Sequence, residues 1–157
     1  MTASPPDATA DPAPARGGPP DADAAGRAWR NLRILMHERG DRRREVTEAL
    51  GLSFFRVKAL RRIAAGPTTL GELAEGLLTD RPYTTLVVED LVKRGLAERA
   101  PNPGDRRSKI VSVTAAGRAA ADEAERILDT PLPALHDLPG GDLAALDRIA
   151  ARLVASS

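Results

Sequence analysis

The segment from Gly66 to Gly117 constrains the fold of this chain most strongly, because several kinds of element follow one another closely in it. Two apolar patterns with helical spacing come first, over Thr69 to Glu75 and over Arg81 to Arg94. Two short alternating stretches around a Pro-Asn-Pro-Gly turn then predict a β-hairpin, and another helical pattern starts at Thr114. Two helices, an arginine-bearing hairpin and a further helix predict a winged helix-turn-helix.

This order of elements favours DNA binding. A helix that follows a tight turn can enter the major groove, and a basic hairpin beside it reaches the neighbouring backbone or the minor groove. We therefore expect double-stranded DNA as a partner.

Three pieces of the segment also resemble MarR-family transcriptional regulators. T-L-G-E-L-A-E at 69–75 is similar to the family's first helix-turn-helix helix, and L-V-K-R-G-L-A-E-R at 91–99 to the end of its recognition helix. D-R-R-S-K-I-V-S-V-T-A-A-G at 105–117 follows the family's wing pattern: D-x-R, five residues, a hydrophobic residue and T-x-x-G. The spacing between the pieces fits without gaps.

The resemblance implies a mainly α fold with a small two- to three-stranded β wing. It covers 24–157, with dimerisation helices over 24–52 and 118–157 and the winged helix over 53–117. It also implies a homodimeric repressor on a pseudo-palindromic operator, released by a small phenolic or lipophilic anion. Residues 1–23, rich in Pro, Asp and Ala without a periodic apolar pattern, predict a disordered tail.

Composition narrows the remaining functions. Hydrophobic residues make up 42% of the chain but aromatic residues only 3%, so aliphatic side chains must form the core. The chain has no Cys and two His, which argues against disulfides, a thiol switch and a metal site. We find no nucleophile–base constellation or phosphate loop and expect no enzyme activity and no cofactor. Without a signal-like apolar run, the expected location is the cytoplasm.

Other helix boundaries can be predicted from capping and breaking residues. A first helix should run over about 24–50, with Gly40 bending or interrupting it, and a second should open after Ser53 and end at Gly66. Thr114 should cap a helix to about Leu128, and a last helix should begin near Asp142.

The terminal helices carry apolar stripes suited to a dimer interface. The stripe on the last helix can instead pack on its own domain, and this alternative stays open. The candidate interface residues are Trp29, Leu32, Leu143, Leu146, Ile149 and Leu153.

In the expected recognition helix, Thr84, Val87, Val88 and Leu91 share one face, which should be buried. The opposite face, with its flanks, should then meet DNA, and Asp80 should cap the helix. The acidic side chains on this helix, Glu89 and Asp90, leave a second hypothesis open: a winged helix that contacts protein. The candidate DNA contacts on the helix are Arg81, Pro82, Tyr83, Thr85, Leu86 and Lys93.

The expected wing adds Asp105, Arg106, Arg107 and Lys109 as DNA contacts. We expect the carboxylate of Asp105 to orient the guanidinium of Arg107 by charge-assisted hydrogen bonds. A solvated turn with a surface salt bridge is the alternative.

Charge is distributed unevenly along the chain. Residues 27–62 hold eleven basic and four acidic side chains, whereas 110–157 hold four basic and seven acidic ones. The asymmetry can orient the protein on a polyanion, although arginines that solvate a helix face are as good an explanation. For the small-molecule site that the resemblance implies, the candidates are Arg33, His37, Phe54 and Phe55.

Overall fold

The computed structural model describes residues 22–156, and the chain divides into two compact units at Arg39 and Gly40. In the first unit, helix α1 (Ala22–Ile34) continues into a π-helical turn, η1 (Leu35–Arg39). The expected tail, 1–23, lies outside the described residues except for its last two, which belong to α1. No helix within 22–156 is long and apolar enough to cross a membrane.

The second unit contains the other elements in chain order. They are α2 (Arg42–Leu50), α3 (Phe54–Ala65), β1 (Thr68–Thr69), α4 (Leu70–Gly76), α5 (Arg81–Lys93), β2 (Ala97–Asn102), β3 (Asp105–Val113), α6 (Ala115–Leu128), α7 (Pro133–His136) and α8 (Gly140–Ala155).

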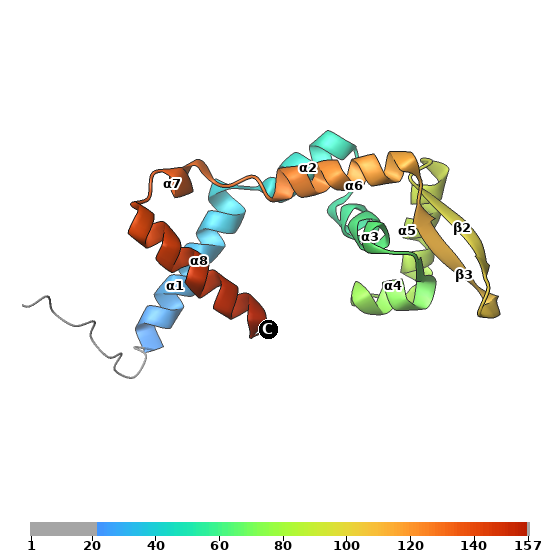
Figure 1. Ribbon diagram of the computed structural model, residues 1–157, viewed down its shortest axis with the longest axis horizontal. Coiled ribbons are helices and arrows are strands. Elements are labelled where there is room, and N and C mark those ends of the chain that lie inside the picture. Colours follow the sequence, from blue (N-terminus) through green and yellow to red (C-terminus); the bar gives the residue numbers. More distant parts are fainter. Residues whose placement is uncertain (1–21, 157) are drawn as a thin grey trace, which may run out of the picture. The chain divides into compact units, whose positions relative to one another are not determined.

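Helix α3 lies at the centre of the core. Helices α2 and α6 lie beside each other and cross it, and α4, α5 and the hairpin of β2 and β3 pack around it as well (Figure 1). Leu60, Ile63, Leu73 and Leu91 are among its largest fully buried side chains. The expected aliphatic core is confirmed for the described residues.

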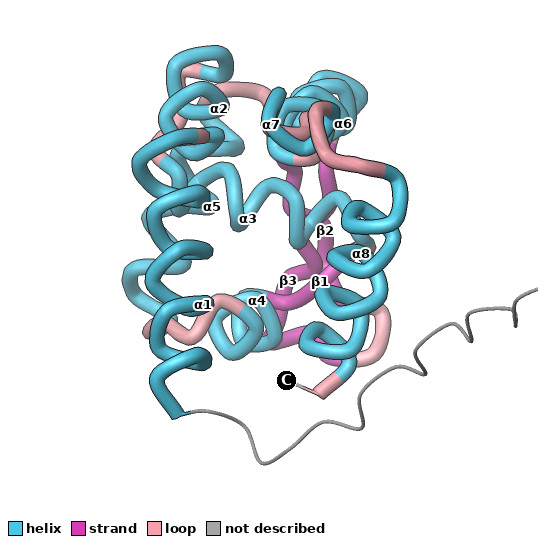
Figure 2. The backbone as a smooth tube through the Cα atoms, turned by 90° about the vertical axis from the view of Figure 1, so that its left-hand side faces the viewer, coloured by secondary structure: helices cyan, strands magenta, loops and turns pink. Residues whose placement is uncertain are grey.

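The sheet has three antiparallel strands in the order β1-β3-β2. Thr68 pairs with Val111, and β1 contacts α4, so the sheet is tied to the first helix of the helix-turn-helix (Figure 2). The hairpin is longer than expected, because Asn102 pairs with Asp105 after a register shift. The side chain of Asn102 accepts from the Gly104 N–H at 3.0 Å and donates to Ser108 Oγ at 2.8 Å, which extends the ladder.

Side-chain caps start the helices where the sequence predicts. Ser53 accepts from the backbone N–H of Arg56, and Asp80 accepts from that of Tyr83. Thr69 and Glu72 form a reciprocal capping box at α4. The hydrogen bond from the Thr69 backbone N–H is the main cause that holds the pKa of Glu72 below its usual value. Because each cap satisfies a free first-turn amide, these positions fix the boundaries of the helix-turn-helix.

The T-x-x-G end of the wing pattern has a direct structural cause. Thr114 Oγ1 donates to the Gly95 carbonyl at 2.6 Å and accepts from the Gly117 N–H at 3.0 Å, so it joins the wing to α6. A Cβ on Gly117 would lie 1.8 Å from the Leu96 carbonyl oxygen. Only glycine therefore allows α6 to approach the loop before β2 this closely.

The interruption expected at Gly40 is confirmed, and the start of the last helix is shifted. Gly40 does interrupt the first helix, because α2 restarts only after Asp41 caps it through the Arg44 N–H. Helix α8 begins at Gly140, two residues before the expected Asp142, although no side chain caps it.

Candidate nucleic-acid interface

The expected recognition helix, α5, has one buried and one exposed face, as predicted. Thr84, Val87, Val88 and Leu91 are all buried. The exposed side chains of the helix include Arg81, Pro82, Tyr83, Leu86, Glu89 and Lys93, and Thr85 is half-buried between the faces. The helix therefore offers a mixed basic, hydroxyl and apolar surface of the kind that reads base edges.

Local contacts hold several of these side chains. The Tyr83 ring packs against Phe55 with ring centroids 4.9 Å apart, so its position is linked to the start of α3. Thr85 Oγ1 donates to the Arg81 carbonyl at 2.9 Å, which leaves its lone pairs as acceptors. A Cβ on Gly71 would lie 2.8 Å from Arg81 Nη2, so this exposed guanidinium lies over the start of α4.

Asp90 of α5 is not a free acid. Its Oδ2 accepts from Arg56 Nε at 2.7 Å and from Arg94 Nε at 2.8 Å. Hydrogen bonds from Arg94 and then from Arg56 hold the pKa of this carboxyl below its usual value. Asp90 therefore anchors α5 to α3, which the sequence did not indicate.

The wing carries its basic side chains along β3. Arg107 and Lys109 are exposed, and Lys109 pairs with Pro101 across the ladder. Asp105 Oδ1 accepts from the backbone N–H of Arg107 at 2.9 Å, whereas we expected a bond to its guanidinium. A short acidic side chain two residues earlier is well placed for such an Asx-type turn, so Asp105 shapes the hairpin backbone. Arg106 lies in β3, and its contact with DNA stays a prediction.

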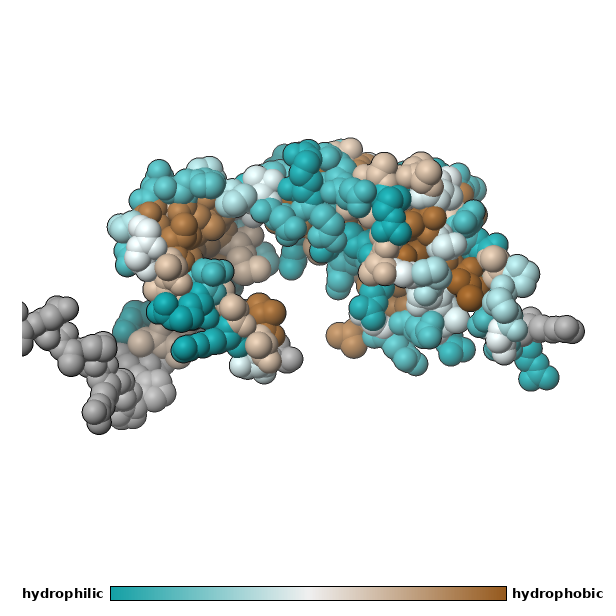
Figure 3. Space-filling model, in the orientation of Figure 1, coloured by the Kyte–Doolittle hydropathy of each residue, from teal (hydrophilic) through white to brown (hydrophobic). Residues whose placement is uncertain are grey.

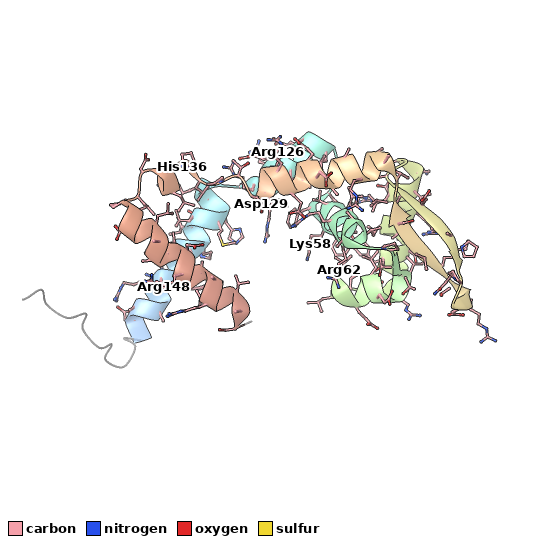
Figure 4. The ribbon with its side chains drawn as sticks, in the orientation of Figure 1. Lys58, Arg62, Arg126, Asp129, His136 and Arg148 are labelled. Atoms are coloured by element: carbon pink, nitrogen blue, oxygen red, sulfur yellow. The ribbon has the colours of Figure 1, made fainter. Side chains whose placement is uncertain are left out.

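Several arginines in 27–62 form ion pairs with acids of the same chain. The pairs are Arg27–Asp23, Arg33–Glu38, Arg42–Glu45, Arg44–Glu48, Arg56–Asp90 and Arg61–Glu125. Lys58 and Arg62 lie one turn apart on α3, and no ion pair is found for either within 22–156 (Figure 4). The pairing favours a structural role for much of this basic stretch.

The candidate interface residues are exposed in the isolated chain. Trp29 and Leu32 are exposed in the first unit, and in the second so are Leu143, Leu146, Ile149 and Leu153. All residues of α8 are described, and none of them is buried. Hydrophobic surface is visible where Figure 1 draws α7 and α8 (Figure 3).

The ligand candidates fall in both units. Arg33 Nη1 lies 3.5 Å from Glu38 Oε1, and His37 belongs to η1. Phe54 and Phe55 are half-buried in α3. Arg43 stacks over Phe54, with its guanidinium carbon 5.0 Å from the ring centroid. The small-molecule site stays a prediction. No cluster of His, Cys, Asp and Glu that could hold a metal occurs among the described residues.

Sequence reasoning missed Arg99 on β2. Its Nη2 donates to the Thr85 carbonyl of α5 at 3.4 Å, and its Nη1 lies 3.9 Å from Glu89 Oε1. The alternation of the strand held the signal, because Arg99 shares a face with the buried Ala97 and therefore points toward the helices.

Comparison with known proteins agrees with this geometry. Residues 56–108, from α3 to the middle of β3, match the model of the MarR family. The chain is 34% identical over 88 residues to the HTH-type transcriptional repressor NicR of Pseudomonas putida. That alignment covers 54% of this chain and 51% of NicR, so the chain spans about half the length of this curated relative.

Solved structures share the fold. The apo form of MarR from E. coli superposes with a TM-score of 0.67 at 24% identity, covering 80% of this chain and 94% of that one. A mutant of E. coli MarR complexed with operator DNA gives a TM-score of 0.59 at 22% identity, covering 86% of this chain and 99% of that one. Residues 56–108 therefore resemble the MarR family, and this matched segment lies within the winged helix-turn-helix.

Proposed function

We propose that the protein is a DNA-binding transcriptional regulator that recognises its operator through α5 and the wing. The observation that carries the proposal is the exposed face of α5, which lies in the same compact unit as the basic strand β3. Helix caps and buried residues hold both elements in place, so this surface is already formed without bound DNA.

The side chains on this surface have suitable chemistry. Arg81 can donate to guanine O6 and N7, Thr85 can bond a base edge, and Leu86 can pack on a thymine methyl group. Tyr83 can donate to a phosphate. Arg107 and Lys109 add positive charge on the wing, where backbone or minor-groove contacts are expected.

We further propose a homodimer on a pseudo-palindromic operator. Helix α8 has leucine and isoleucine side chains along one stripe and no buried residue, so a second copy is the simplest cover for it. The assignment of 24–52 and 118–157 to dimerisation is part of this proposal. Two-fold symmetry in the protein then requires two half-sites in the DNA.

Repression and release by a small phenolic or lipophilic anion in the cytoplasm complete the proposal. The relative NicR is named a transcriptional repressor, and one similar structure is a complex with operator DNA. The name of NicR supports the repressor assignment, and the operator complex supports DNA binding.

The alternative, a protein-interaction module, has less support. It needs acidic side chains free on α5, but Asp90 is bonded to two arginines and Glu89 lies near Arg99. An acidic docking face is therefore largely neutralised within the protein itself.

The test is selection of duplexes from a random library by the full chain. A DNA-binding regulator enriches one pseudo-palindromic sequence and binds it with steep salt dependence. If no sequence is enriched and binding to random duplex is also absent at low salt, the proposal is wrong.

A further inference from the structure

Arg99 is placed between the wing and the recognition helix. It lies on β2 opposite Val111 of β3, which is fully buried, and it shares a strand face with buried Ala97. Only 23% of its side chain is exposed. Burial of a charge is costly unless hydrogen bonds and an opposite charge compensate it. A largely buried arginine on a strand therefore needs such partners, unlike a solvated one.

Its guanidinium makes two contacts, both with α5. Nη2 donates to the Thr85 carbonyl at 3.4 Å, in the middle of the helix, and Nη1 lies 3.9 Å from the Glu89 carboxylate. Since these residues are four apart, the planar guanidinium spans one helical turn. Nε is buried and has no hydrogen-bond partner among the described residues.

Both contacted residues border the face proposed to meet DNA. Glu89 is the exposed acid of that face, and in a DNA complex its charge would oppose nearby phosphates. The cation of Arg99 lies beneath it, on the inner side of the sheet, so Arg99 can offset this charge without reaching the DNA.

We infer that Arg99 is a positioning residue for DNA recognition: it fixes the angle between α5 and the wing and neutralises Glu89. The inference rests on the proposed function. It assigns Arg99 no contact with DNA, which separates its role from that of Arg107 at the wing.

The experiment uses the full chain and the duplex that the unmodified protein selects from a random library. The variants are Arg99→Gln, Glu89→Gln, the double variant, and Arg107→Gln as the control for a phosphate contact. Affinity is measured over a salt series on the selected and on a scrambled duplex, and a thermal melt shows that each variant folds. Arg99→Lys keeps the positive charge but lacks the planar guanidinium, and it replaces Arg99→Gln in the comparison if that variant does not fold.

We expect Arg99→Gln to weaken binding to the selected duplex by about ten-fold and to leave the salt slope unchanged. The loss should be several-fold smaller in the Glu89→Gln background, because no uncompensated acid then faces the DNA. Arg99→Lys should show an intermediate loss, also at unchanged slope. Arg107→Gln should instead reduce the slope by about 0.9.

Three results would overturn the inference: no loss of affinity in Arg99→Gln, an equal loss in both Glu89 backgrounds, or a slope reduced as in Arg107→Gln. Failure of the proposed function is a separate outcome, since the unmodified chain would then select no duplex.

Discussion

The carboxylate of Asp90 lies 2.7 Å from Nε of Arg56, and this contact joins the recognition helix α5 to α3. Arg94 bonds the same oxygen at 2.8 Å and donates through Nη1 to the Gly51 carbonyl at 3.3 Å. The loop between α2 and α3 is thereby tied to α5 as well. One flank of α5 is held by this network and the other by Arg99.

Asp90→Asn tests the network through its pH dependence. The folded-state pKa of Asp90 is lowered, so its contribution to stability is present above the unfolded-state pKa and is lost as the pH falls through the folded-state value. At neutral pH the variant should melt at a lower temperature than the unmodified chain, and the difference should shrink in acid.

Melting curves over a pH series check this, with Asp137→Asn as the control at an exposed carboxylate for which no ion pair is found within 22–156. A difference in melting temperature that stayed constant into strong acid would mean that ionisation of Asp90 is not its cause.

Leu78→Gly should stabilise the protein. Leu78 lies two residues after α4 in a left-handed conformation, with φ of 53°, and is 95% exposed. The Thr79 N–H donates to the Ala74 carbonyl and the Leu78 N–H to that of Glu75, a helix ending that favours glycine at this position. Relief of about 1 to 2 kcal/mol of backbone strain outweighs the extra chain entropy of glycine, about 0.5 to 1 kcal/mol.

The expected net gain is roughly 0.5 to 1 kcal/mol in the free energy of unfolding, measured by urea titration. Leu78→Ala is the matched control, because it removes the exposed side chain but keeps the strain. An equal gain in both variants would assign the effect to side-chain exposure instead.

Leu146→Glu on α8 tests the dimer. Leu146 lies in the stripe proposed to meet a second copy, and a charge buried there should weaken the dimer by more than ten-fold. Ala144→Glu adds the same charge on the opposite side of the helix and should leave the dimer intact. Sedimentation of both variants decides, and a Leu146→Glu dimer as stable as the control would show that this stripe is not the interface.

Much of the fold follows from local sequence signals. Capping side chains at Ser53, Thr69, Asp80 and Thr114 mark the helix starts, and the apolar spacing in α5 identifies its buried face. Strand β1 could not be predicted in this way. It has two residues, too few for an alternating pattern, and it forms only because β3 pairs with it.

The site was less predictable, because its anchors are contacts between distant residues. Asp90 contacts Arg56, 34 positions earlier in the chain. Arg99 on β2 contacts Thr85 on α5, 14 positions earlier. A sequence shows each charge but not its partner. Asp105 also differs from the prediction, for a local reason. Its carboxylate accepts from the backbone N–H of Arg107, two residues later, whereas we expected a bond to the guanidinium of Arg107.

We expect α5 to read bases and the wing to supply phosphate contacts. Salt titrations of Arg81→Ala and Arg107→Ala on the selected and the scrambled duplex test this expectation most directly. Arg81→Ala should cost roughly 1 to 3 kcal/mol on the selected duplex and much less on the scrambled one. Arg107→Ala should weaken binding to both duplexes and reduce the salt slope by about 0.9, the value for one phosphate contact. Unchanged affinity and unchanged slope in both variants would contradict the account.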